Sequence, residues 1–395
     1  MGKEHLIPQE EMLEVEKKKN RMVIGIPKEI QKQESRVALT PEAVNKLVNE
    51  GHEVVVESGA GLAANYVNTD YSEMGGYIVE KREEVFHSDV VLKIAPFSLE
   101  EIDLLKGKQS ILSTLHFNAQ TEEFIRKLMA RKVTAIAFEN IKDENNCYPV
   151  VRSMSSIAGT TSILIAAEYL SNVRGGKGVM LGGIPGITPA EVVILGAGTA
   201  SESAVRAALG LGAQVKIFDN SIHRLRRLQS AIGHPLYTSV FHAQVLEKTL
   251  KSADIVIGAL YLVEQGPRYV VTEDMVRGMK KGSVIVDISI DQGGCIETSR
   301  CMSQVSPVFE KHGVIHYCVP NIPSRVARTA SIAISNVITP ILIQMGESGS
   351  TDRFLKNDLG VRNGVYIFNG ILTNNFIGKH FGITSKDIDL LMAAF

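Results

Sequence analysis

Residues 191–201, EVVILGAGTAS, decide the fold that this chain is expected to adopt. A short apolar run, which predicts a buried strand, leads into Gly196-x-Gly198-x-x-Ser201, and the alanine-rich segment from Ala204 predicts a helix directly after it. Gly196 can form the tight turn, and Gly198 leaves room for a pyrophosphate at the N-terminus of the helix. Serine stands where a third glycine or alanine is usual, but it is small enough for close helix–strand packing. The pattern predicts a dinucleotide-binding Rossmann unit.

The acid that follows the next apolar run indicates which dinucleotide this unit binds. Residues 214–218 predict a second strand, and Asp219 comes directly after it, 18 residues beyond Ser201. A carboxylate at this distance can accept a hydrogen bond from the ribose 2′-hydroxyl, and it would repel the 2′-phosphate of NADP. The alternative is a plain strand–turn–helix without a ligand. Because strand, glycines and acid occur together, we expect NAD as the cofactor.

Apolar runs alternate with amphipathic segments on both sides of this unit, which is typical of parallel sheets wound with helices. The runs that predict strands are residues 22–27, 53–57, 90–94, 110–115 and 133–138 in the first part, and 191–195, 214–218, 255–258, 283–287 and 313–317 in the second. Two long apolar patterns, residues 155–170 and 330–345, predict helices that connect the two parts.

The order of these segments predicts a split domain. We expect an α/β fold of two doubly wound domains, in which a Rossmann NAD-binding domain (155–324) is inserted into a substrate domain. The substrate domain then consists of residues 22–154 and 325–395, and residues 1–21 form an N-terminal extension. A chain of 395 residues is long enough for two such domains.

Composition excludes several classes of function. The formal net charge is −1, from 42 basic and 43 acidic residues, so no overall field favours nucleic acid or an anionic membrane. We find no run of 18 apolar residues and expect no membrane segment. The four cysteines form no CxxC pair, and histidines and carboxylates show no ligand spacing, so we expect no metal site. Reduced thiols in the cytoplasm are the expected state.

Several further segments resemble one family, the alanine dehydrogenases together with the related NAD-binding component of proton-translocating transhydrogenase. These segments are residues 24–29 (IGIPKE), 36–42 (RVALTPE), 154–159 (MSSIAG), 175–189, 196–198 (GAG), 286–295 (VDISIDQGGC) and 317–323 (YCVPNIP). They span the chain from residue 22 to about residue 345. The Asp291-Gln-Gly-Gly stretch is more similar to the dehydrogenase branch, L-alanine dehydrogenase in particular.

The resemblance implies roles for three residues in catalysis and substrate binding. Arg36 matches the arginine that holds the substrate carboxylate, an anion that a guanidinium fork suits. His116 matches the catalytic histidine, although a single histidine after a strand is by itself more often structural. Asp291 matches an acid beside the nicotinamide, and it follows a predicted strand at the edge where wound α/β sites are built.

Two weaker matches and two departures complete this picture. The resemblance places Ser155 near the cofactor and Asn321 near the substrate. Alanine stands at position 95, where the family carries a substrate-contacting lysine, two residues beyond Lys93. Lys93 is the substitute that we consider, since both positions face the same side of a strand. Residues 261–266 (YLVEQG) also differ from the family's loop near the cofactor.

We therefore expect reversible, NAD-dependent oxidative deamination of L-alanine to pyruvate and ammonium, in a homo-oligomer. One alternative is an NAD(H)-binding, transhydrogenase-like subunit without an amino-acid substrate. A second is an NAD-binding protein that has lost catalysis, against which Arg36 and His116 argue. A third is a related dehydrogenase that acts on another, bulkier amino acid, for which Ala95 would enlarge the pocket.

Overall fold

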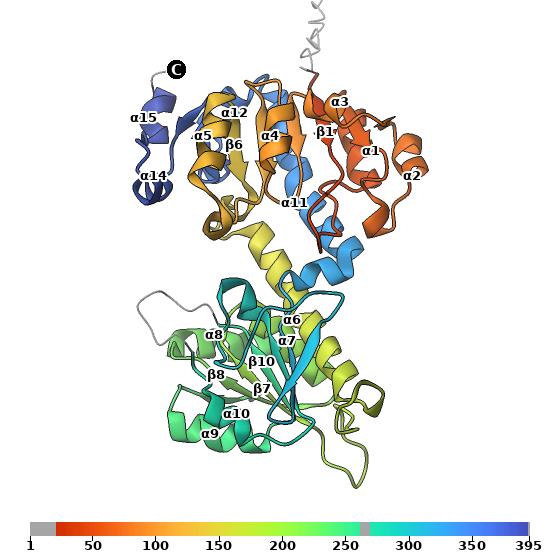
Figure 1. The fold of residues 1–395 in the computed structure, drawn as a ribbon, viewed down its shortest axis with the longest axis vertical. Coiled ribbons are helices and arrows are strands. Elements are labelled where there is room, and N and C mark those ends of the chain that lie inside the picture. The colour runs from red at the N-terminus through yellow and green to blue at the C-terminus, as the bar shows by residue number, and fades with distance from the viewer. Residues whose placement is uncertain (1–20, 261–268, 394–395) are drawn as a thin grey trace, which may run out of the picture.

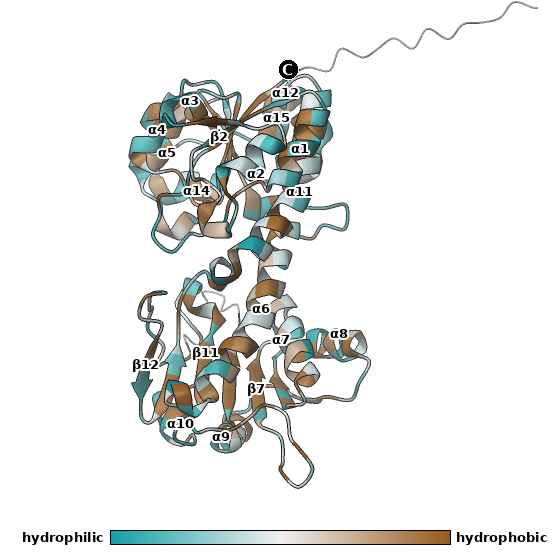
Figure 2. Ribbon diagram, turned by 90° about the vertical axis from the view of Figure 1, so that its right-hand side faces the viewer, coloured by the Kyte–Doolittle hydropathy of each residue, from teal (hydrophilic) through white to brown (hydrophobic). Residues whose placement is uncertain are grey.

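The computed structural model describes residues 21–260 and 269–393, which form two lobes joined by two long helices (Figure 1). The predicted N-terminal extension, apart from Arg21, and the divergent stretch 261–266 lie outside the described residues. Each lobe is built on one sheet, and Figure 2 shows hydrophobic residues concentrated in the strands of both. The chain is therefore a two-domain α/β protein, as the sequence predicts.

The first lobe contains an eight-stranded sheet in the order β15-β14-β6-β5-β4-β1-β2-β3. Its strands are β1 (Val23–Ile26), β2 (Glu53–Glu57), β3 (Tyr77–Val79), β4 (Val90–Leu92), β5 (Ser110–Ser113), β6 (Thr134–Ala137), β14 (Val365–Phe368) and β15 (Ile371–Leu372). The first six are parallel, whereas β14 runs antiparallel to β6 and β15 antiparallel to β14.

Helices on both faces of this sheet bury its apolar residues in two clusters. They are α1 (Pro41–Asn49), α2 (Asn68–Glu73), α3 (Arg82–Phe86), α4 (Leu99–Leu104), α5 (Glu122–Ala130), α12 (Thr351–Asn357), α13 (Leu359–Arg362), α14 (Asn375–Phe381) and α15 (Ile388–Ala393). Thr40 caps the N-terminus of α1, because its Oγ1 accepts the Ala43 N–H at 3.4 Å.

The second lobe contains a seven-stranded sheet in the order β12-β13-β11-β10-β7-β8-β9. Its strands are β7 (Glu191–Leu195), β8 (Gln214–Phe218), β9 (Tyr237–Ser239), β10 (Ile255–Gly258), β11 (Val284–Asp287), β12 (Val308–Lys311) and β13 (Val314–Tyr317). The helices of this lobe include α7 (Thr199–Gly210), α8 (Ile222–Ile232), α9 (Ala243–Ser252) and α10 (Glu273–Arg277). Only β12 is antiparallel, and the central β7–α7–β8 unit is the one that the glycine motif predicts.

Two long helices, α6 (Pro149–Leu170) and α11 (Ala327–Glu347), pass between the lobes (Figure 1). The chain leaves the first sheet after β6, builds the whole second sheet, and returns through α11 to add β14 and β15. Because α6 already starts at Pro149, the expected boundary between residues 154 and 155 falls inside one continuous helix. A proline is tolerated at position 149 because the first N–H groups of a helix have no acceptor within the helix.

Both connecting helices are apolar enough, by length and composition, to span a membrane. In this fold, 44% of the apolar window that starts in α6 and 50% of the one that includes α11 are buried within the protein. Helix α6 packs on α7 and α11, and α11 also packs on α1. Their apolar composition therefore follows from their place between the two lobes.

Candidate active site

Most of the predicted site residues lie in the segments that follow the C-terminal ends of strands in both sheets, and Ser155 lies on α6. Three hydrogen bonds join the lobes there: Ser35 N–H to Ser324 Oγ at 2.7 Å, Gln304 N–H to Gln33 Oε1 at 3.2 Å, and Asn321 Nδ2 to Glu34 Oε2 at 3.0 Å. In parallel α/β sheets, ligands bind outside this edge. The structure thus brings the expected edges of both sheets to one place.

Arg36 is buried and held by an acid that the sequence reasoning did not single out. Its Nε donates to Glu34 Oε1 at 2.7 Å and its Nη2 donates to Glu34 Oε2, with 8% and 5% of the two side chains exposed. Burial opposes ionisation of Glu34, but the hydrogen bonds and charge of Arg36 outweigh it, so the pKa of Glu34 lies below its usual range. The only signal in the sequence was an acid two residues before the arginine.

Asn321 connects this pair to Asp291. Its side-chain amide donates to Glu34, and its backbone N–H donates to Asp291 Oδ1 at 3.1 Å. Asn321 has a left-handed backbone (φ 56°), a conformation that asparagine tolerates better than most residues. Both amide contacts come from one turn after β13, so this turn fixes the relative positions of Glu34 and Asp291.

Asp291 lies in the turn after β11, and its carboxyl interacts electrostatically with His116 and Arg36 of the other lobe. Surrounding protein raises the pKa of Asp291 above its usual range, although solvent still reaches the residue. The Asn321 N–H, the nearby His116 and the charge of Arg36 partly oppose this rise. Hydrogen bonds thus connect Arg36, Glu34, Asn321 and Asp291, and His116 lies within electrostatic range of Asp291.

Lys93 is engaged elsewhere. Its ammonium is completely buried and donates to both oxygens of Glu101, at 3.0 and 2.8 Å, and it lies 3.5 Å from Glu29 Oε2. Glu101 stands in the first turn of α4 and also binds Arg82, so Lys93 belongs to a buried network of ion pairs. Because the ammonium of Lys93 donates to Glu101, Lys93 is not among the residues that we propose to bind the substrate.

Glu29 is a second acid that the sequence reasoning did not single out. Its Oε1 accepts the N–H groups of Ile94 and Ala95, whereas its Oε2 is buried without a hydrogen bond in the described part of the chain. Burial raises the pKa of Glu29 to about 7, despite the nearby charge of Lys93. Ala95 stands where the family carries a lysine. The backbone N–H groups of Ile94 and Ala95 are thus bound by a carboxyl whose pKa is near neutrality.

The glycine turn has the form that a pyrophosphate requires. Gly196 has φ 109°, and a Cβ there would lie 2.4 Å from the carbonyl oxygen of Ala259. Gly198 caps the N-terminus of α7, and a Cβ there would meet no described atom within 4 Å. The first N–H groups of a helix have no partner within it and favour an anion. The open space beside Gly198 therefore fits the pyrophosphate of NAD.

Asp219 lies at the expected end of β8 and supports the same turn. Its Oδ2 accepts the Ala197 N–H at 2.8 Å and its Oδ1 accepts the Ser221 N–H at 2.7 Å, and 3% of the residue is exposed. A carboxylate oxygen can accept more than one hydrogen bond, so these contacts leave capacity for a ribose hydroxyl. Asp219 thus fixes the backbone of the glycine turn. Its contact with the ribose of NAD stays a prediction.

Ser155 lies on α6, close to both parts of the site. The residue before it, Met154, accepts a hydrogen bond on its sulfur from Arg36 Nη1 at 3.4 Å. One helical turn further, a Cβ on Gly159 would lie 2.0 Å from the carbonyl oxygen of Ala200 at the start of α7. Along α6, Ser155 therefore lies between the contact with Arg36 and the contact with the N-terminus of α7.

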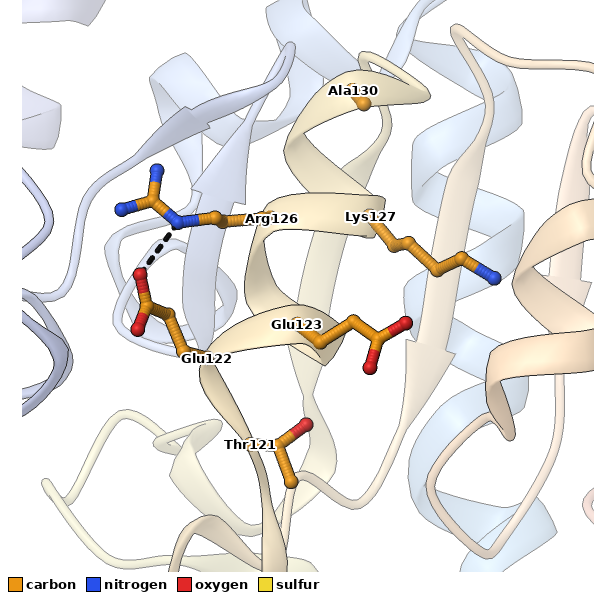
Figure 3. A pocket seen from close by; sticks show the side chains of 6 residues that line it. All are labelled: Thr121, Glu122, Glu123, Arg126, Lys127 and Ala130. Carbon is orange, nitrogen blue, oxygen red and sulfur yellow. Dashed lines mark hydrogen bonds and ion pairs between the residues drawn. The ribbon is translucent and has the colours of Figure 1, made fainter.

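The hollow in Figure 3 lies away from this space and carries no site. Its six lining residues all belong to α5 or to its N-cap: Thr121, Glu122, Glu123, Arg126, Lys127 and Ala130. One face of a single helix cannot enclose a substrate, and Glu122 pairs with Arg126 at 2.7 Å as ordinary surface residues do. Across residues 21–260 and 269–393, no three or more His, Cys, Asp or Glu residues gather as they would around a metal ion.

The fold and the site define a class, the two-domain NAD-dependent dehydrogenases, in which a Rossmann lobe faces a substrate lobe across polar residues. Comparison with protein families narrows this class. Residues 25–158 match the alanine dehydrogenase/PNT N-terminal domain, and residues 162–375 match the C-terminal domain of the same family. The chain belongs to the alanine dehydrogenase/PNT family.

Individual relatives agree with this assignment. Alanine dehydrogenase from Staphylococcus saprophyticus is 38% identical over 369 residues, which cover 93% of this chain and 99% of the relative. A solved structure of L-alanine dehydrogenase superimposes with a TM-score of 0.86 at 36% identity, covering 91% of this chain and 99% of that one. The transhydrogenase structure from Sinorhizobium meliloti is more distant, with a TM-score of 0.76 and 25% identity over 89% of this chain and 99% of that one.

Proposed function

We propose that this chain catalyses the reversible, NAD-dependent oxidative deamination of L-alanine to pyruvate and ammonium. The observation that supports the proposal is the electrostatic interaction of Asp291 with His116 and Arg36 of the other lobe, in a chain that also carries an open glycine turn at the start of α7. The relatives named alanine dehydrogenase match over nearly the whole chain and support the same activity. The likeness to transhydrogenase is more distant, so the hypothesis of a transhydrogenase-like subunit is less well supported.

Arg36 holds the substrate carboxylate in this proposal. Glu34 accepts hydrogen bonds from Nε and Nη2 of Arg36. Further N–H groups of the guanidinium are left to bind a second carboxylate. Asn321, which shares Glu34 with the arginine, lies where it can contact the same end of the substrate. Glu34 therefore orients both substrate-binding residues and stays in place when the substrate enters.

His116 and Asp291 carry the proton transfers. NAD, when bound, accepts the hydride from the α-carbon of alanine. His116 takes a proton from the water that adds to the resulting imine and returns one to the departing amine, a task for which a histidine is suited. Asp291 orients the water or ammonia, because its carboxyl faces His116 from the other lobe.

A related dehydrogenase for a bulkier amino acid is the second candidate. Ala95 is small and buried beside the site, and its N–H is held by Glu29. A longer side chain in its place would reduce the room for substrate, so the alanine favours a wider range of amino acids. The panel of substrates in the experiment below separates this candidate from the first.

The proposal includes a cytoplasmic homo-oligomer that uses no nucleic acid, metal or membrane. Apolar side chains on the two connecting helices support self-association, since Leu164 on α6 and Ile332 on α11 are 53% and 42% exposed. Exposed apolar groups of this kind are common at subunit interfaces. Light scattering of the purified protein gives the mass and tests this part of the proposal.

Reduction of NAD by amino acids tests the activity itself. NADH formation is followed at alkaline pH with L-alanine and a panel of larger amino acids, in the wild type, His116→Ala and His87→Ala. His87 is an exposed histidine at the end of α3 and serves as the matched control. We expect turnover of L-alanine that is lost in His116→Ala and kept in His87→Ala. Tight NADH binding without oxidation of any amino acid contradicts the proposal.

A further inference from the structure

The guanidinium of Arg36 contacts a sulfur atom as well as a carboxylate. Its Nε and Nη2 donate to Glu34, and its Nη1 donates to Sδ of Met154 at 3.4 Å. Glu34 thus binds the Nε–Nη2 side of the planar fork, and Nη1 is the nitrogen that it leaves for other acceptors. Under the proposed function, this part of Arg36 holds the substrate carboxylate. Met154 therefore contacts the part of the arginine on which substrate binding depends.

The fold keeps Arg36 and Met154 next to each other. The Val37 N–H, just after the arginine, donates to Ser331 Oγ on α11 at 2.9 Å. Met154 lies in the second turn of α6, and α6 packs on α11. The two partners of the contact are therefore held by the same pair of helices, so the sulfur stays beside the guanidinium.

Oxidation would change the sulfur of Met154 from a weak acceptor into a strong one. A thioether sulfur accepts hydrogen bonds only weakly. Hydrogen peroxide transfers one oxygen atom to it: an S–O bond forms, the O–O bond breaks, the sulfur is oxidised and the peroxide is reduced to water. The new polar oxygen is attached to the atom that already lies 3.4 Å from Nη1. Met154 is only partly buried, so a small oxidant can reach it.

We propose that Met154 is a site of reversible oxidation that controls substrate binding: its sulfoxide accepts a hydrogen bond from Arg36 and competes with the substrate carboxylate. This inference rests on the proposed role of Arg36. The bond from a guanidinium to the sulfoxide oxygen is charge-assisted, and such bonds are stronger than neutral ones. Methionine sulfoxide reductases, one for each epimer, return the sulfoxide to methionine. Peroxide therefore lowers the affinity for the amino acid, and reduction restores it.

Treatment with hydrogen peroxide tests the proposal in the wild type, Met154→Leu and Met180→Leu. Met180, in the segment before β7, is 63% exposed and serves as the matched control. Dithiothreitol is added afterwards to reduce oxidised thiols, and mass spectrometry locates the sulfoxides. We expect the KM for alanine to rise about ten-fold or more in the wild type and Met180→Leu. The Kd for NADH should stay unchanged, and methionine sulfoxide reductases should restore the KM.

Met154→Leu and Met154→Gln separate the sulfoxide from other effects of the treatment. Both variants keep the four cysteines, so any effect of thiol oxidation is common to all the proteins. Peroxide should therefore leave the KM of both variants unchanged. Glutamine has a carbonyl oxygen close to the position of the sulfoxide oxygen, so without peroxide Met154→Gln should have a higher KM for alanine than Met154→Leu. Equal KM values in the two untreated variants overturn the competition for Arg36.

The outcomes separate this inference from the proposed function. If the untreated wild type oxidises no amino acid, the proposed function fails and the inference fails with it. If the untreated wild type oxidises alanine but its KM stays the same once Met154 carries a sulfoxide, only the inference is overturned. The same holds if Met154 resists peroxide while Met180 is oxidised. An equal rise of the KM in Met154→Leu places the damage elsewhere and also overturns the inference.

Discussion

The side-chain amide of Asn321 donates to Glu34 at 3.0 Å, and this hydrogen bond joins the nucleotide lobe to the substrate lobe at the centre of the site. The same carboxylate binds the guanidinium of Arg36, so two residues that we propose to bind the substrate, one from each lobe, share one acceptor. Glu34 therefore contributes both to the contact between the lobes and to the orientation of Arg36. Four predictions follow from this geometry and from the neighbouring buried groups.

Replacing Glu34 by glutamine is expected to weaken alanine binding and leave NADH binding unchanged. The amide keeps the size of the side chain, but its nitrogen cannot accept from Arg36 and the charge is lost. Breaking a buried pair by removing one partner typically costs about 3–5 kcal/mol, part of which falls on the orientation of Arg36. The KM for alanine should rise at least about ten-fold, measured beside the Kd for NADH. A higher Kd for NADH with an unchanged KM for alanine contradicts this role.

Replacing Arg36 by lysine tests the shape of its side chain separately from its charge. Lysine keeps the positive charge but cannot bind Glu34 with two parallel N–H groups and a substrate carboxylate at the same time. We expect kcat/KM for alanine to fall by about a hundred-fold or more, the range for a lost charge-assisted contact. Arg126→Lys, an exposed change on α5, is the control. Similar kinetics in Arg36→Lys and the wild type would mean that a point charge suffices.

The space beside Gly198 is predicted to hold the pyrophosphate. A methyl group there meets no described atom within 4 Å, so Gly198→Ala should fold normally and lose NADH affinity by about ten-fold or more. Gly210→Ala is matched to it, because Gly210 ends the same helix and also has open space around its Cα. Fluorescence titration with NADH compares the two variants. Equal affinity in both contradicts the placement of the pyrophosphate.

Glu29 should make stability depend on pH between about 4.5 and 7. Burial raises the pKa of Glu29 from its usual value of 4.5 to about 7, so the folded protein keeps this proton at pH values where the unfolded chain has released it. The contribution of the neutral acid is fully present below pH 4.5, declines as pH rises towards 7 and is lost above it. It amounts to about 3 kcal/mol at most. The Tm of Glu29→Gln, relative to the wild type, should rise with pH across this window. A constant difference in Tm from pH 5 to 8 refutes this prediction.

Local sequence was sufficient for the strands of the nucleotide lobe. The patterns at 191–195, 214–218 and 255–258 match β7, β8 and β10 residue for residue, because these central parallel strands are rich in apolar residues and either end at glycine or are followed by glycine or an acid. Strands at or next to the sheet edges were missed. Tyr77–Val79 is short, and Val365–Phe368 becomes a strand only because it pairs with β6, which is more than two hundred residues earlier in the chain.

The site was predictable in part for a similar reason. Residues that we propose to touch ligands, such as Arg36 and Asp291, lie within motifs that a family shares, so resemblance can point to them. Glu34, Glu29 and Glu139 bind other protein groups, Glu139 the N–H groups of Leu115 and His116, and their partners are defined by the folded chain. Glu139 offered one usable signal, since it follows the strand next to the one that precedes His116. Lys93 shows the converse, because strand alternation alone could not reveal that Glu101 binds its ammonium.

The most direct test of the account is the reverse reaction with labelled ammonium. Oxidation of NADH is measured with pyruvate and ¹⁵N-ammonium, and the product is analysed for labelled L-alanine, in the wild type and in His116→Ala. The account predicts that NADH consumption requires both pyruvate and ammonium, equals the labelled L-alanine formed, and collapses in the variant. An enzyme that binds NADH but forms no alanine, or that forms it equally well without His116, would contradict the assignment of this site.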